Sequence, residues 1–99
     1  MEFKGTPGPW YTSNEGRLLV RDEEWQCVIA DSIGCNGEEE EVANARLISA
    51  APEMLDALIK IVEMNQQYAI DKYGDVRKAE EMSCVRTARA AINKALGCE

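Results

Sequence analysis

Histidine is absent from the 99 residues, and with it the side chain best suited to proton transfer near neutral pH. Its absence excludes Ser-His and Cys-His catalytic pairs and every histidine-ligated metal site. The sequence also lacks the Gly-x-Gly-x-x-Gly and Gly-x-x-x-x-Gly-Lys patterns that cradle phosphates. The chain has 18 acidic residues, and the clusters at 23–24, 38–41 and 80–81 fall in turns and helix starts, where solvated charge is the ordinary interpretation. We therefore expect no enzymatic activity, no catalytic residue and no cofactor.

The four cysteines include no Cys-x-x-Cys pair, so their spacing predicts no zinc site. No apolar run approaches the roughly 20 residues of a membrane helix, and Met1–Lys4 lacks the start of a signal peptide. We therefore expect a cytoplasmic protein without membrane contact, in which the thiols stay reduced. Cys27 on a strand and Cys84 on a helix are expected to be small core residues.

Negative charge dominates the chain, whose net charge is −7. Residues 1–71 carry 14 acidic and 5 basic side chains, whereas residues 72–99 carry 4 and 6. Phosphate backbones repel an acidic body, so general nucleic-acid binding is excluded.

The first third of the sequence has the period of β-strands. Strands are predicted at residues 10–13, 18–21 and 26–32, separated by the turn signals at 14–16 and 22–24. Such short spacings favour an antiparallel meander, because hairpins need only short turns. We place this three-stranded β-meander within residues 1–33.

After Gly34–Gly37 the apolar period changes from about 2 to about 3.6, which predicts helices over residues 38–96. The acidic run Glu38–Glu41 suits a helix start, and Pro52 breaks the helix and begins the next one. Gly74 and Gly97 are expected stops, and Asp75 is expected to cap the last helix. The sequence thus predicts one α+β domain over residues 1–99, with a three-stranded antiparallel β-meander followed by two to three α-helices.

The helix that follows Pro52 is apolar over about half of its circumference, which is more than one short sheet and one helix can cover. We therefore expect a homo-oligomer, most simply a dimer. The residues expected in this arc are Leu55, Leu58, Ile59, Ile61, Val62, Ala69 and Ile70.

Several polar residues lie on apolar stripes or beside aromatic side chains. Arg89 lies on the same helix stripe as the residues expected to be buried. One prediction is that its aliphatic part packs on the core while its guanidinium reaches solvent or pairs with a carboxylate on the preceding helix. The other is that it anchors a subunit or ligand interface. Asn65 and Gln66 also enter an apolar arc, and nearby backbone groups are expected to satisfy them. The tryptophans and arginines of the strands suit either a core or a binding hot spot. The candidate binding residues are Trp10, Arg17, Arg21, Trp25, Asn44, Arg46 and Arg89.

Three motifs give the chain a family resemblance: Gly8-Pro9-Trp10, the central segment 42–58 (VANARLISAAPEMLDAL), and the terminal segment 88–96 (ARAAINKAL). They resemble small proteins encoded by tailed phages and prophages of enteric and related bacteria. The resemblance implies an accessory phage protein that acts inside the infected or lysogenic bacterium. It adds Asn44 and Arg46 to the candidate residues, because both lie in the central motif.

The resulting hypothesis is a non-enzymatic binding protein that engages a host protein or a small signalling ligand and counteracts host defence. One alternative is a structural or assembly module of the phage whose only partner is itself. Another is an acidic mimic of nucleic acid, which the basic last helix disfavours. Capture of partners from a host lysate, with mass spectrometry of co-purifying metabolites, would discriminate among a protein partner, a small ligand and self-association.

Overall fold

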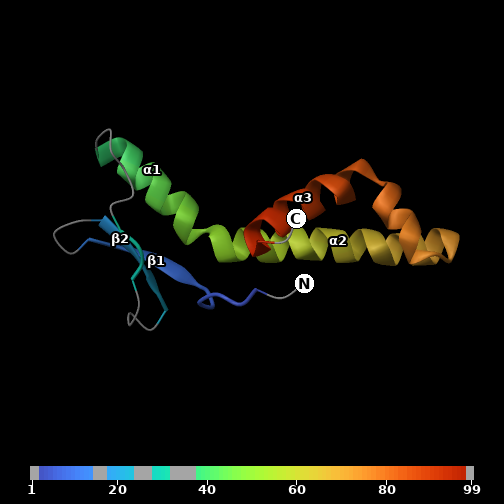
Figure 1. Ribbon diagram of the computed structural model, residues 1–99, viewed down its shortest axis with the longest axis horizontal. Helices are drawn as coiled ribbons and strands as arrows, with labels where there is room; N and C mark the ends of the chain where they lie inside the picture. The colour runs from blue at the N-terminus through green and yellow to red at the C-terminus, as the bar shows by residue number, and fades with distance from the viewer. Residues whose placement is uncertain (1–2, 15–17, 24–27, 32–37, 98–99) are drawn as a thin grey trace. The chain divides into compact units, whose positions relative to one another are not determined.

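Figure 1 shows the computed structural model, which describes residues 3–14, 18–23, 28–31 and 38–97. The chain divides into two compact units. The sheet unit is Gly5–Met54, and the helical unit is Leu55–Glu99 together with Met1–Lys4.

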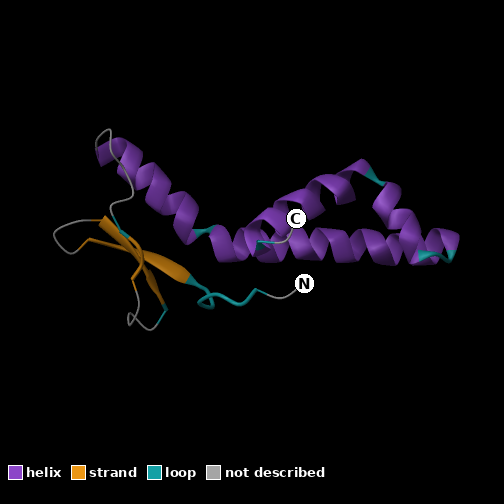
Figure 2. Ribbon diagram, in the orientation of Figure 1, coloured by secondary structure: helices purple, strands orange, loops and turns teal. Residues whose placement is uncertain are grey.

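The sheet unit contains a three-stranded antiparallel sheet in the order β1-β2-β3 (Figure 2). Its strands are β1 at Trp10–Asn14, β2 at Leu18–Asp22 and β3 at Val28–Ala30. β1 pairs with β2 in continuous register, whereas the pairing of β2 with β3 shifts between Val20 and Arg21. The predicted meander is therefore confirmed, because alternating residues separated by short turns fold into hairpins.

Helix α1, at Glu38–Ser49, completes the sheet unit and contacts β1 and β2. Ala45 on the helix and Leu19 and Val20 on the central strand are buried. Because successive residues of a strand point to opposite faces, burial of both Leu19 and Val20 means that each face of β2 is covered.

Proline ends the first helical run as the sequence predicts. α1 stops at Ser49, Ala50 forms a turn, and α2 runs from Ala51 to Tyr73 with Pro52 in its first turn. Gly8 lies directly against this proline, since a β-carbon added at Gly8 would lie 2.5 Å from the Pro52 Cβ. The first two family-like motifs therefore meet in the folded chain.

The helical unit consists of most of α2, the short 3₁₀ helix η1 at Val76–Glu81, and α3 at Ser83–Leu96. α3 folds back along α2 (Figure 1), and both contribute to one core. The buried residues of this core are small or β-branched: Val62, Ala69, Ala79, Val85, Ala88 and Ile92.

The two predicted glycine stops are confirmed. Gly74 follows α2 with φ of 68°, and its amide donates to the Ile70 carbonyl at 2.9 Å. Gly97 follows α3 with φ of 77° and donates to the carbonyls of Asn93 and Lys94. A residue with a β-carbon is strained in this left-handed conformation, so glycine is the residue that ends each helix cleanly.

Asp75 does not cap the last α-helix, which corrects the sequence prediction. Its carboxylate accepts from the Arg77 amide at 2.9 Å and caps η1, while α3 begins after Met82. The buried Ala79 of η1 and the half-buried Met82 at its end are three residues apart, which puts them on one side of a helix with three residues per turn.

Candidate binding surfaces

The outer face of α2 exposes a stripe of apolar side chains at alternating spacings of four and three residues. Ala57, Ile61, Met64 and Tyr68 form this stripe, which we call the α2 seam. The last three are 42%, 70% and 48% exposed, respectively. This spacing is that of the a and d positions through which one helix packs against another.

The seam corrects the predicted burial of the central helix. Ile61 was expected in the core but lies in the seam, and Ile70 is 45% exposed. α3 and η1 cover only the arc that contains Val62 and Ala69. The sequence shows that the helix is widely apolar, but the position of the neighbouring helix decides which part of the arc is buried.

The seam ends at an open groove of about 450 Å³ beside Tyr68. The groove combines aromatic, apolar and charged side chains from the end of α2 and from η1 through Met82. Lys78 and Glu81 form an ion pair of 3.4 Å beside it. The described lining residues are Tyr68, Tyr73, Lys78, Glu81 and Met82.

Lys72 orders the tyrosines next to this groove. Its ammonium nitrogen donates to the Tyr68 hydroxyl at 3.0 Å and lies 5.5 Å from the centre of the same ring. A nitrogen at those two distances sits beyond the hydroxyl end of the ring, so the hydrogen bond is the main interaction. This hydrogen bond, with a smaller contribution from Tyr73, raises the pKa of Lys72. Lys72 is therefore a fixed positive charge at the end of the seam.

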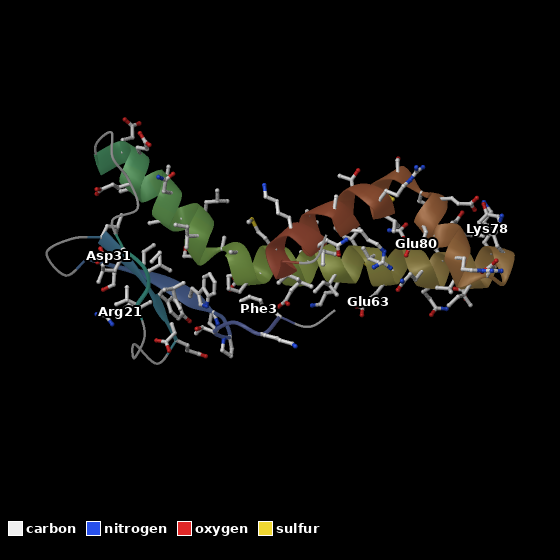
Figure 3. The ribbon with its side chains drawn as sticks, in the orientation of Figure 1. Phe3, Arg21, Asp31, Glu63, Lys78 and Glu80 are labelled. Carbon is white, nitrogen blue, oxygen red and sulfur yellow. The ribbon has the colours of Figure 1, made fainter. Side chains whose placement is uncertain are left out.

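Trp10 and Arg21 do not share a surface. Trp10 pairs across the strands with Asp22, and Tyr11 pairs with Arg21, so alternation puts Trp10 and Arg21 on opposite faces of the sheet. Trp10 is half-buried, and its indole N–H donates to the Thr6 carbonyl at 3.2 Å. Arg21, labelled in Figure 3, lies on the same face as the exposed Tyr11. The predicted partners Arg17 and Trp25 lie outside the described residues.

The two candidates in the central motif occupy different positions on α1. Asn44 is half-buried, whereas Arg46 is exposed. Arg46 lines a shallow hollow of about 540 Å³ together with Glu39, Val42 and Ala43. The structure therefore presents Arg46 on an accessible helix face and sets Asn44 partly into the unit.

Arg89 forms an ion pair with Glu80, which is labelled on η1 in Figure 3. The Arg89 Nη2 lies 2.6 Å from the Glu80 Oε1, and Nε donates to both carboxylate oxygens at 2.7 and 2.9 Å. Arg89 thus forms an ion pair as predicted, but its partner lies on η1 and not on the central helix α2. The ion pair fixes α3 to η1, since the two residues belong to different elements.

The structure also tests the expected hydrogen bond of Asn65 and the expected burial of Cys84. Asn65 donates its amide N–H to the Ile61 carbonyl at 2.8 Å, so nearby backbone satisfies it as predicted. Cys84, in contrast, is exposed and is not a core residue. The next residue, Val85, takes the buried position of that turn, and adjacent residues on a helix do not share a face.

Neither a metal site nor a membrane span is found in the described part of the chain. Residues 3–14, 18–23, 28–31 and 38–97 contain no group of three His, Cys, Asp or Glu side chains placed to hold a metal ion. The helices among them are too short or too polar to cross a membrane. Among the described residues, the seam with its groove and the outer face of α1 are the two surfaces at which an exposed helix face and a hollow coincide.

The fold and these surfaces define a small α+β protein with accessible helix faces. Comparison with protein families supplies its origin: the chain belongs to the family described as Salmonella phage P22 protein Y8K6, whose model matches residues 1–99. It is thus a phage protein. No curated protein and no solved structure matches the sequence significantly.

Proposed function

We propose that this phage protein is a non-enzymatic binding protein that engages a host protein in fixed ratio in the bacterial cytoplasm. The observation that carries the proposal is the exposed α2 seam with its alternating four-residue and three-residue spacing. Helical recognition uses anchors at this spacing, so the partner's matching element is an amphipathic helix.

The shape of the surface favours a protein partner over a small ligand. A small-molecule site encloses most of its ligand, whereas the groove beside Tyr68 and Tyr73 is open and continues into a helix face. Tyrosine and methionine are enriched at protein interfaces because they offer a large contact area and adapt to the partner. A small signalling ligand would have to bind in the tyrosine groove alone.

The charges beside the seam restrict the partner further. Lys60 and Glu63 lie on the same helix as the seam and are exposed, and Lys72 is fixed at its end. Glu63 is labelled in Figure 3. A partner helix that carries acidic residues near Lys72 and Lys60 would match this pattern.

The phage origin of the family supports a target in the bacterial host. Within that setting, we propose a host defence protein as the target, since inhibition in fixed ratio needs no catalytic chemistry. The absence of histidine from the sequence agrees with this mode of action.

The test compares two variants that add the same charge to the same helix. Met64→Glu places a carboxylate in the centre of the seam, whereas Ile70→Glu places one at an exposed position outside it. Wild-type protein and Ile70→Glu are expected to capture the same host protein in a fixed molar ratio, measured by native mass spectrometry. Met64→Glu is expected to lose that protein at an unchanged melting temperature, because burying a carboxylate without a partner is costly.

Equal capture by both variants would show that the seam is not the binding surface. Saturable consumption of a substrate by substoichiometric protein would overturn the non-enzymatic reading. Capture of a metabolite that survives Met64→Glu and is lost in Tyr73→Ala would instead favour a small ligand in the groove.

A further inference from the structure

The outer face of α1 is accessible and carries both apolar and charged side chains. Glu39, Ala43, Arg46 and Leu47 are exposed on it, and Leu47 is 62% exposed. Val42 joins three of them in lining the hollow of about 540 Å³. At 100° per residue Glu39, Ala43, Arg46 and Leu47 lie on the side of the helix that faces away from the buried Ala45, and the half-buried Val42 lies at the edge of that side.

Charge is distributed along this face in a way that matches the face to itself. Glu39 stands near the beginning of the helix and Arg46 stands seven residues later, about 10 Å along the axis and nearly in line with it. If a second α1 lies antiparallel across a two-fold axis between Val42 and Ala43, each Glu39 faces an Arg46 of the other copy. The small side chain of Ala43 lets the two helices approach closely at the centre.

A parallel arrangement of two copies would fail on the same residues. It would place each Glu39 beside the Glu39 of the other copy and each Arg46 beside the other Arg46, so that like charges face each other. The antiparallel arrangement pairs opposite charges instead, and it opposes the two helix dipoles. Only the antiparallel geometry is therefore compatible with the charges.

We infer that α1 is a homodimer interface in which a second copy of this chain packs antiparallel about Val42 and Ala43, with two symmetric Glu39–Arg46 ion pairs. The sequence-based expectation of a dimer rested on the apolar width of α2. The charge pattern assigns the contact to α1 instead, and this leaves the α2 seam for another partner. The inference is independent of the proposed function.

Charge reversal tests the inference, because it alters both ion pairs at once in a symmetric dimer. Sedimentation equilibrium is measured at about 50 mM salt, where exposed charges are weakly screened, and at up to about 1 mM protein. Arg46→Glu and Glu39→Arg are each expected to raise the dimer dissociation constant about tenfold, since each replaces two attractions with two repulsions. The double variant Glu39→Arg/Arg46→Glu is expected to restore the wild-type constant.

The set of variants contains its own controls. The single variants change the net charge in opposite directions, so a common loss of dimer cannot come from overall repulsion. Lys94→Glu makes the same charge change as Arg46→Glu at an exposed position of α3 and is expected to leave the dissociation constant unchanged. Circular dichroism measures the helical content of each variant. If one of the single variants is misfolded, the other single variant carries the test.

Three results would overturn the inference: a wild-type monomer at about 1 mM, a double variant that stays as weak as the single variants, or a dimer that is lost in Met64→Glu. The last result would place the dimer contact on the α2 seam. Loss of host-protein capture in Met64→Glu with an intact dimer would uphold both proposals. Host-protein capture tests the proposed function and the dimer dissociation constant tests the α1 interface, so either proposal can fail without the other.

Discussion

The contact between Gly8 and Pro52 makes a sharp prediction about the sheet unit. In Gly8→Ala the new β-carbon would lie 2.5 Å from the Pro52 Cβ and 2.9 Å from its Cγ. Carbon atoms in contact normally stay about 3.5–4.0 Å apart, so one of the two segments has to move. The ring of Pro52 has no rotamer to escape into, because it is closed onto the backbone in the first turn of α2.

The expected cost is that of overpacking a fitted site, about 1–3 kcal/mol of unfolding free energy. A domain of this size loses about 4–8 °C of melting temperature per kcal/mol, so the expected decrease is roughly 4–24 °C. The added methyl group contributes no burial that offsets this cost, because the space it needs is already occupied.

Calorimetry on a double-mutant cycle measures the coupling. Pro52→Gly removes the atoms that the new methyl group meets, at the separate cost of glycine in a helix. Gly8→Ala is therefore expected to be clearly destabilising in the wild-type background and nearly neutral in Pro52→Gly.

An unchanged melting temperature in Gly8→Ala would refute the reasoning, because it would mean that the segment before β1 moves away from α2 at no cost. A large decrease that persists in the Pro52→Gly background would locate the strain elsewhere. Either result would show that the contact between Gly8 and Pro52 does not limit the stability of the sheet unit.

Three further predictions concern the helical unit. Ile92→Ala removes a fully buried side chain and is expected to lower the unfolding free energy by about 2–5 kcal/mol in urea denaturation. A double-mutant cycle on Glu80 and Arg89 is expected to give a coupling of only about 0.2–1 kcal/mol, since the pair is partly exposed, and a coupling of about 3 kcal/mol or more would contradict that exposure. The hydrogen bonds from Arg77 lower the pKa of Asp75, so its stabilising effect is present above the pKa of the unfolded chain and is lost as pH falls through the lower folded-state pKa. Carboxyl NMR titration should show this lowered pKa, and Arg77→Ala should raise it toward the ordinary value.

The coarse fold follows from local patterns in the sequence. The period change after Gly37, the proline at position 52 and the glycines at 74 and 97 each act within a few residues, and the structure places helix limits where they predict. Local rules succeed here because strand alternation, helix breaking and left-handed caps do not depend on distant neighbours.

The surfaces could not be predicted in the same way, because they depend on what lies across from each residue. Ile61 and Val62 are adjacent and both strongly apolar, yet Val62 is buried under the neighbouring helices and Ile61 is exposed. Strand register likewise separates Trp10 from Arg21, although their types suggested one cluster. The four-three spacing of the α2 seam was readable in the sequence, but the same spacing also fits a buried face.

The division of the chain into two units separates its fluorescent side chains. Both tryptophans, Trp10 and Trp25, belong to Gly5–Met54, whereas Tyr68 and Tyr73 belong to the helical unit. Indole emission therefore reports on the sheet unit alone, and tyrosine emission from a Tyr11→Phe variant reports on the helical unit. One unlabelled protein can thus reveal, in a single thermal scan, whether its two units melt together or one after the other.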